Sequence, residues 1–196
     1  PGVKIWTAED PVEITQLGLR QVQCQSKIGL NFARVMRAFL RADPDVIMIG
    51  EMRDEETASI GVEASLTGHL VFSTLHTNSA PETVTRLLDM GLNPLNFSDA
   101  FLGVLAQRLA RRLCKECRKE YHPSEEEILE IKKTYGREHF DEHGTQLTPE
   151  TVLIRTEGCD ACNGTGYKGR LGIHELMEGT KEIKRMIKKE APTEDL

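Results

Sequence analysis

The chain has 196 residues, which is enough for one sizeable domain or for a domain with a small module. Its 25 basic and 31 acidic residues give a net charge of −6, which argues against nucleic acid as the main partner because phosphate binding requires a positive field. No apolar run approaches the roughly 18 residues needed to cross a bilayer, and the opening PGVKIWTAED has neither an export-signal pattern nor a Met. We therefore expect a cytoplasmic fragment of a longer protein.

Strand-like and helix-like segments alternate through the first part of the chain. Strands are predicted at residues 3–11, 45–51 and 69–77, and helices at residues 31–42, 55–68, 81–91 and 96–113. The alternation predicts an α/β fold with a mainly parallel sheet flanked by helices.

The texture changes after residue 113, where the chain becomes polar, Gly-rich and cysteine-bearing. A charged stretch at residues 124–144 predicts a helix and a solvated loop, and residues 181–189 predict a basic amphipathic helix. We expect an α/β core over residues 1–113, a cysteine module over residues 114–174 and a C-terminal helical segment over residues 175–196.

Acids and histidines stand at the ends of the predicted strands. Glu51 follows the apolar run of residues 46–50 directly, and His76 ends the next strand, which His69 opens. Ligands of open α/β sheets gather at the carboxyl ends of the strands. Glu51 therefore matches a Walker B acid that faces Mg²⁺ and nucleotide phosphates. The alternative is a strand-end acid that pairs with Arg53, and either histidine alone can be an ordinary hydrogen-bonded residue.

A second group of acids follows the first predicted strand. Glu9, Asp10 and Glu13 lie in the stretch TAEDPVE. Together with Glu51 and His76 they would supply carboxylates and an imidazole to one edge, a set suited to holding a metal-bound phosphate and activating water. For this set we favour a functional interpretation.

Arginines are dense in the same part of the chain. Arg34, Arg37 and Arg41 share one face of a predicted helix, and Arg20 and Arg53 lie nearby in sequence. Guanidinium groups clamp phosphate oxygens bidentately and can be supplied by a neighbouring subunit. The alternative is a solvated basic face.

The chain contains no G-x-x-x-x-G-K-[ST] sequence and no Gly-Lys dipeptide. The loop that cradles the β-phosphate of ATP is therefore absent, and a Walker B strand without it cannot bind ATP well. Either the nucleotide interpretation is wrong or the P-loop precedes Pro1.

Four of the five cysteines form two C-x₂-C pairs, Cys114 with Cys117 and Cys159 with Cys162. Two such pairs complete a tetrahedron around one Zn²⁺, and four sulfurs leave no open position, so we expect a structural zinc site. Two redox motifs or unpaired core cysteines are the alternatives. Cys24 has no partner in this pattern.

Several longer stretches resemble the secretion ATPases of the type II secretion and type IV pilus superfamily, over roughly Val3 to Met177. These stretches are TAEDPVE, LRADPDVIMIGEMRDEETA, ASLTGHLVFSTLHTNSAPETVTRLLDMG, LGVLAQRLARRLC and GYKGRLGIHEL. The resemblance implies a RecA-like core, with TAEDPVE as the Asp box, IMIGEMRD as the Walker B box and GHLVFSTLHTNSA as the His box. The family's P-loop precedes its Asp box, so the chain resembles a C-terminal catalytic half that would be inactive alone.

The resemblance also assigns roles residue by residue. Glu9, Glu51, His69 and His76 would be catalytic, Asp10 and Glu13 would assist around Mg²⁺ and the attacking water, and Arg20, Arg34 and Arg41 would contact phosphate or a neighbouring subunit. The cofactors implied are ATP and Mg²⁺ besides the structural zinc. The partners implied are further copies in a homohexamer and an inner-membrane platform protein at the cytoplasmic face, peripheral to the membrane, with no nucleic acid.

Retraction ATPases of the superfamily that the chain resembles generally lack the paired C-x₂-C motif, so the resemblance implies an assembly or secretion ATPase. GLRQVQ and RAFLRADPD resemble the pilus assembly branch more than the type II secretion branch, which stays the alternative. A different class of function is a zinc-dependent docking or nucleic-acid-binding module. Its support is the basic run Arg108, Arg111, Arg112, Lys115, Arg118 and Lys119.

Overall fold

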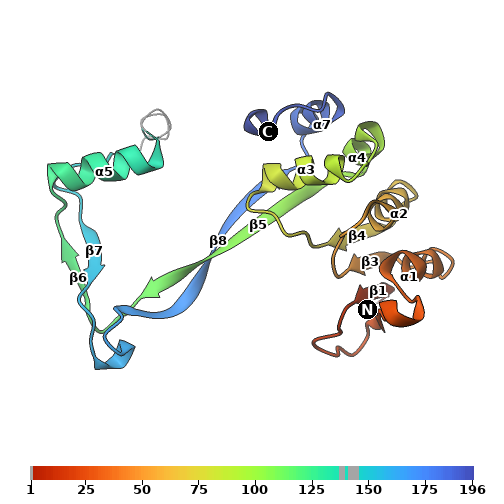
Figure 1. Cartoon of the computed structure of the whole chain (residues 1–196), viewed down its shortest axis with the longest axis horizontal. Coiled ribbons are helices and arrows are strands. Elements are labelled where there is room, and N and C mark those ends of the chain that lie inside the picture. The colour runs from red at the N-terminus through yellow and green to blue at the C-terminus, as the bar shows by residue number, and fades with distance from the viewer. Residues whose placement is uncertain (1, 137–139, 141–145) are drawn as a thin grey trace. The chain divides into compact units, whose positions relative to one another are not determined.

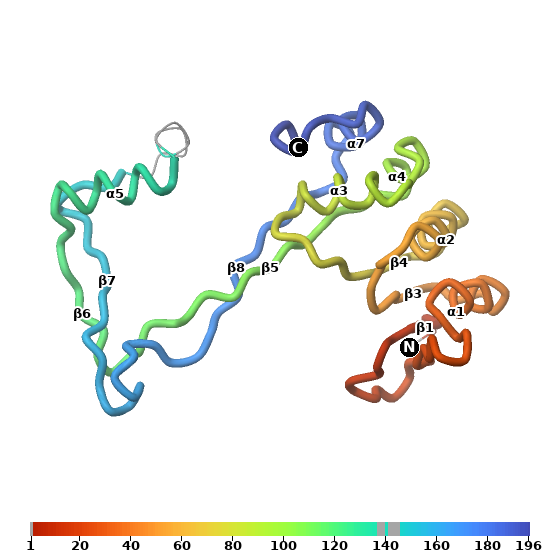
Figure 2. The backbone as a smooth tube through the Cα atoms, viewed as in Figure 1, coloured from red at the N-terminus to blue at the C-terminus, as the bar shows by residue number. Residues whose placement is uncertain are grey.

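The computed structural model describes residues 2–136, 140 and 146–196 (Figures 1 and 2). Residue contacts divide the chain into two compact units, Pro1–Arg108 with His174–Leu196, and Leu109–Ile173. The domain boundaries expected from sequence stay predictions. Among the described residues, no helix combines the length and apolar character that a membrane span requires.

The first unit contains a four-stranded sheet in the order β2-β1-β3-β4. The strands are β1 (Ile5–Glu9), β2 (Arg20–Gln23), β3 (Val46–Ile49) and β4 (Leu70–Ser73). All three pairings are parallel, which confirms the predicted α/β fold with a mainly parallel sheet. The register places Ala8 opposite Ile49 and Ile49 opposite Ser73, so the residues that follow β1, β3 and β4 emerge at one edge.

Two helices cover one face of this sheet, α1 (Phe32–Phe39) and α2 (Glu55–Leu66). Each begins at a side-chain cap, since Asn31 accepts a hydrogen bond from the Arg34 amide and Asp54 accepts one from the Thr57 amide. The buried cluster beneath them joins residues of β1 and β3 to the apolar side of α1. Trp6 also packs edge-on against Phe39, with ring centroids 5.1 Å apart.

A second cluster in the same unit forms around α3 (Ala80–Asp89), α4 (Pro94–Ala100) and α7 (Lys181–Lys188). Helix α4 packs against both α2 and α7. The Ile187 side chain is fully buried, and the ring centroids of Phe97 and Phe101 lie 5.6 Å apart. The apolar side of the predicted C-terminal helix is therefore used inside the protein. Short 3₁₀ turns lie at Ser26–Ile28 and Thr193–Asp195.

The helix predicted over residues 96–113 is wrong beyond residue 100. Helix α4 ends at Ala100, and Gly103–Leu113 form strand β5, which pairs with β8 (Tyr167–Glu178) in a two-stranded ribbon (Figure 1). A Cβ at Gly103 would lie 2.9 Å from the Met177 carbonyl oxygen, so the two backbones approach closely there. Pairing with a strand some 60 residues away outweighs the helix propensity of this Leu-, Ala- and Arg-rich segment.

The second unit contains an antiparallel pair of strands and a helix. Strand β6 (Arg118–Tyr121) pairs antiparallel with β7 (Leu153–Thr156), and α5 (Glu125–Tyr135) follows β6. A 3₁₀ turn spans Asp160–Cys162. The helix predicted after residue 124 is present, with Ser124 as its cap. Most of the predicted solvated loop, at residues 137–139 and 141–145, lies outside the described residues.

Candidate functional site

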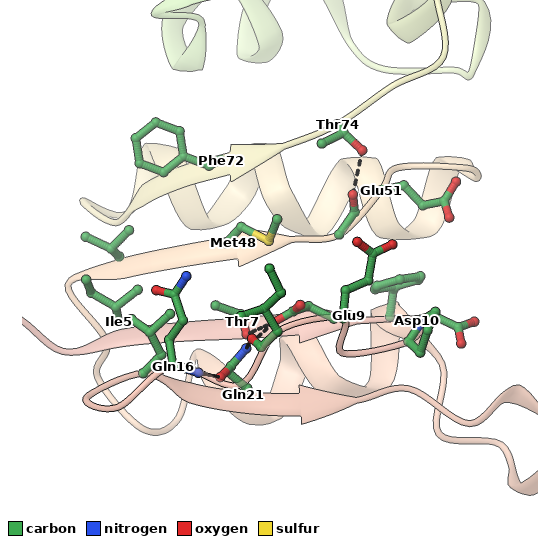
Figure 3. Close-up of a pocket in the computed structure, with 17 residues that line it drawn as sticks. Ile5, Thr7, Glu9, Asp10, Gln16, Gln21, Met48, Glu51, Phe72 and Thr74 are labelled. Carbon is green, nitrogen blue, oxygen red and sulfur yellow. Dashed lines mark hydrogen bonds between the residues drawn. The ribbon is translucent and has the colours of Figure 1, made fainter. Parts of the chain in front are cut away.

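A cavity of about 730 Å³ lies over the sheet face opposite α1 and α2 (Figure 3). Its floor is apolar and is formed by alternate residues of β1, β3 and β4, including Ile5, Val46, Met48 and Phe72. Its polar lining includes four carboxylates, those of Glu9, Asp10, Glu13 and Glu51. The cavity thus joins an apolar floor to a concentration of negative charge near the carboxyl ends of the strands.

The Glu9 carboxylate is held in place by its neighbours in the sheet. Its Oε1 atom accepts hydrogen bonds from Thr7 Oγ1 at 2.6 Å and from Gln21 Nε2 at 2.9 Å. Gln21 also donates to the Ile14 carbonyl at 3.0 Å and accepts from the Gln16 amide at 2.7 Å, which fixes the loop between β1 and β2. Sequence reasoning missed Thr7 and Gln21. Strand alternation places Thr7 on the same face as Glu9 and could have identified it.

Gly50 allows the strand before Glu51 to pass close to β1. Its amide donates to the Ala8 carbonyl at 2.7 Å, and a Cβ there would lie 3.1 Å from the same oxygen. Thr74 Oγ1, just past β4, donates to the Gly50 carbonyl, a hydrogen bond drawn in Figure 3. The backbone that presents Glu51 is therefore bonded to the strand on either side.

The Glu51 side chain is only 13% exposed and makes two charged contacts. Its Oε1 pairs with the Arg53 guanidinium, and its Oε2 lies 3.7 Å from Nε2 of His76. The hydrogen bond from Arg53 and the charge of Glu51 raise the pKa of Arg53 further above its usual range. The Oε2 atom is buried and has no hydrogen-bond partner among the described residues. A buried carboxylate oxygen in this state is costly unless a ligand or water occupies it.

The structure brings Glu9, Asp10, Glu13 and Glu51 to one cavity and places His76 beside Glu51. His69 lies elsewhere, because it precedes β4 and so stands at the opposite edge of the sheet. Its Nδ1 is 3.0 Å from the Ala64 carbonyl oxygen and 3.3 Å from Thr67 Oγ1, both at the end of α2. In this chain His69 therefore contacts the C-terminal end of α2, and its catalytic role stays a prediction.

The predicted arginines do not line the cavity. Arg20 lies over the Trp6 ring, 5.7 Å from its centroid, and Arg34 Nη1 donates to the Gly29 carbonyl at 3.4 Å. Arg37 pairs with Glu56 of α2, and Arg41 is exposed just past α1. These positions match the alternative of a solvated basic face, and the phosphate and inter-subunit roles of Arg20, Arg34 and Arg41 stay predictions.

The four paired cysteines meet in the second unit. The Sγ atoms of Cys114 and Cys159 lie 3.9 Å apart, those of Cys117 and Cys162 lie 3.9 Å apart, and all four lie within 4.8 Å of one another. A tetrahedron with Zn–S bonds of about 2.3 Å requires S···S separations of about 3.8 Å. All four cysteines are free thiols. The donor set fits one structural zinc ion.

Backbone amides contribute to this cluster. The amides of Cys159 and Gly166 each donate to Cys162 Sγ at 3.2 Å. The Cys159 amide is the main reason that the pKa of Cys162 falls to about 6, whereas desolvation raises the pKa of Cys117 to about 12. Cys24 is separate from the four-cysteine cluster. It is 2% exposed and lies in the buried cluster beneath α1 and α2, where burial raises its pKa to about 11.

Comparisons with known proteins agree over the whole chain. Residues 1–196 match the family described as Type II/IV secretion system protein. The type IV pilus assembly ATPase PilB of Thermus thermophilus is 48% identical over 187 residues, which is 95% of this chain and 20% of that protein. The type II secretion system ATPase E of Vibrio cholerae is also 48% identical over 187 residues, covering 95% of this chain and 35% of that protein.

Among solved structures, the crystal structure of the pilus retraction motor PilT with bound ADP superposes with a TM-score of 0.59 at 28% identity. The match covers 96% of this chain and 42% of that one. The chain thus spans less than half the length of each of these three proteins. With its PilT-like α/β fold and its full-length match to the family, the chain belongs to the Type II/IV secretion system protein family.

Proposed function

We propose that this chain is the C-terminal catalytic half of a homohexameric ATPase that powers type IV pilus assembly. The observation that carries the proposal is the convergence of Glu9, Glu51 and His76 on one edge of a parallel sheet, with an unpartnered Glu51 oxygen among them. The relatives named above are ATPases of pilus assembly and of type II secretion. On this proposal the protein works at the cytoplasmic face of the inner membrane with a platform protein.

Each residue at this edge of the sheet would have a different role in hydrolysis. Glu51 Oε2 would accept a hydrogen bond from the attacking water and orient it, because Oε1 is already engaged by Arg53. Glu9 is fixed by Thr7 and Gln21, so it presents its other oxygen without reorganisation. Asp10 and Glu13 add hard oxygen donors suited to Mg²⁺. When bound, Mg²⁺ would neutralise charge on the phosphates of ATP.

The test is a substitution in the full-length protein. We expect Glu51→Gln to lower the rate of ATP hydrolysis by about 100-fold or more while nucleotide binding changes little. The amide oxygen could still accept a hydrogen bond from the water, but it has no negative charge to polarise that water and is too weak a base to take its proton. Glu63→Gln, an exposed acid of α2, is the matched control and should hydrolyse ATP normally. The isolated 196-residue chain should show little turnover. Appreciable magnesium-dependent hydrolysis by that chain, or by Glu51→Gln, would contradict the proposal.

Type II secretion is the second candidate, because relatives from both systems are 48% identical to the chain. Complementation of deletion strains separates the two. Restored pilus assembly with no restored secretion is the result we expect.

A docking or nucleic-acid-binding role has less support. Of the basic run, Arg108 donates to the Asn78 carbonyl, Arg111 stacks over Tyr167, Arg112 donates to the Lys168 carbonyl, and Lys119 pairs with Glu157. These side chains are exposed, but each already has a partner within the chain, which leaves it less available to bind phosphate. Binding of duplex DNA with a steep salt dependence would favour this alternative.

A further inference from the structure

The loop between β4 and α3 carries His76 and is bonded to the β5–β8 ribbon at two points. Arg108 of β5 donates both Nε and Nη2 to the Asn78 carbonyl oxygen, at 3.1 and 2.9 Å. Oε2 of Glu175, in β8, accepts a hydrogen bond from the Ala80 amide at 2.9 Å. Two charged side chains from paired strands thus hold backbone groups two residues apart in the same loop.

The rest of the loop is tied to α3. The Asn78 amide donates to Glu82 Oε2 at 2.9 Å, so both polar groups of the Asn78 backbone are engaged. The hydroxyl groups of Thr77 and Thr83 lie 2.6 Å apart. The segment after His76 is therefore fixed by hydrogen bonds from the ribbon and from the helix.

His76 itself depends on this backbone for its position. Its side chain is 89% exposed, and its one charged contact among the described residues is the 3.7 Å approach of Nε2 to Glu51. An exposed ring with a single long contact is not fixed by packing. Its distance from Glu51 is set by the course of the chain between Thr74, bonded to Gly50, and Asn78, bonded to Arg108.

We propose that Arg108 and Glu175 are positioning residues that hold the His76 loop so that the imidazole stays beside Glu51. The inference deepens the proposed ATP hydrolysis and, in its kinetic consequences, rests on it. It also gives a role to two stretches that the site does not otherwise use, LGVLAQRLARRLC and GYKGRLGIHEL, which contain Arg108 and Glu175.

The chemistry of the two contacts explains the residue types. A guanidinium offers two N–H groups in a fixed plane and can bind one carbonyl with both, whereas a lysine ammonium is a single mobile point charge. Glu175 meets the first residue of α3, where backbone amides lack partners within the helix and the helix dipole favours a negative charge. Each contact therefore restrains direction as well as distance.

The kinetic test uses the full-length protein. We expect Arg108→Gln to lower kcat for ATP hydrolysis roughly tenfold, or about 1.4 kcal/mol, with KM for ATP unchanged within about twofold. Arg108→Lys should recover only part of the loss. The matched control is Arg112→Gln, which removes a similar hydrogen bond on the same strand, to the Lys168 carbonyl, and should leave kcat unchanged.

A double-mutant cycle separates positioning from general destabilisation. If Arg108 acts through the imidazole, Arg108→Gln should cost less than about twofold in a His76→Ala background. Losses that multiply fully in the double variant, or an equal loss in Arg112→Gln, would overturn the inference.

A second measurement does not depend on hydrolysis. Hydrogen exchange at the Ala80 amide should accelerate about tenfold or more in Glu175→Ala and much less in Glu175→Gln, whose amide oxygen still accepts. Glu178→Ala, an exposed acid on the same strand, is the control. If the wild-type protein does not hydrolyse ATP, the proposed function fails. Hydrogen exchange alone then tests whether Glu175 restrains the His76 loop. Unchanged exchange in Glu175→Ala overturns the inference even in an active ATPase.

Discussion

Loss of one cysteine ligand should unfold the second unit while leaving the first intact. The perturbation is Cys117→Ser, which removes one of four sulfurs that lie within 4.8 Å of one another. We expect wild-type protein to carry about one zinc per chain and the variant to carry little, because a hydroxyl group is a poor replacement for a thiolate ligand.

The magnitude follows from how little else holds this unit together. Its large buried apolar side chains among the described residues are Ile128 and Phe140, and both buried core clusters lie in the other unit. Burial of two such side chains contributes about 1.5–3 kcal/mol each. Structural zinc in small modules contributes about 10 kcal/mol or more. The metal should therefore supply most of the free energy that stabilises the second unit.

The assay combines metal analysis with hydrogen exchange. Amides of β6 and β7 should lose protection in Cys117→Ser, whereas amides of β1 and β3 should keep it. Cys24→Ala is the control, because it removes a thiol outside the cluster and should retain the zinc. Full protection of β6 and β7 in a metal-free variant would refute the reasoning.

Three further substitutions test packing and local geometry. Gly166→Ala should destabilise the cysteine unit and lower its zinc content, because the new Cβ would lie 2.3 Å from Thr156 Oγ1; Gly164→Ala, at nearly the same positive φ but with nothing within 4 Å, should do much less. Ile187→Ala should cost about 2–5 kcal/mol in the free energy of unfolding, measured by denaturant titration, and a cost near zero would contradict its burial. Asp54→Ala should cost about 1 kcal/mol by the same titration, since it uncaps α2, and an unchanged midpoint would show that the cap contributes nothing.

The strands that end at the site could be predicted from sequence because their signal is local. Residues 46–49 are a short apolar run followed by Gly50 and an acid, and the structure makes them β3. A parallel sheet then brings Glu9 and Glu51 to the same edge without further information. The same logic could have excluded His69 from that edge, since it stands before its strand rather than after it.

The ribbon could not be predicted in this way. Residues 103–113 are rich in good helix formers, and their pairing with β8 depends on residues far along the chain. Gly103, inside the supposed helix, was the available warning. The contacts of Arg108 and Glu175 follow from that pairing, and a helix over residues 96–113 does not predict them.

The apolar floor of the cavity bears on any experiment with this chain alone. Parallel sheets ordinarily have both faces covered, yet here Phe72 is 55% and Leu70 38% exposed, while Met48 and Val46 line an open hollow. Such a surface attracts fluorescent hydrophobic dyes and favours self-association as concentration rises. Melting temperatures of the isolated chain should therefore be compared at several protein concentrations before they are taken as properties of the fold.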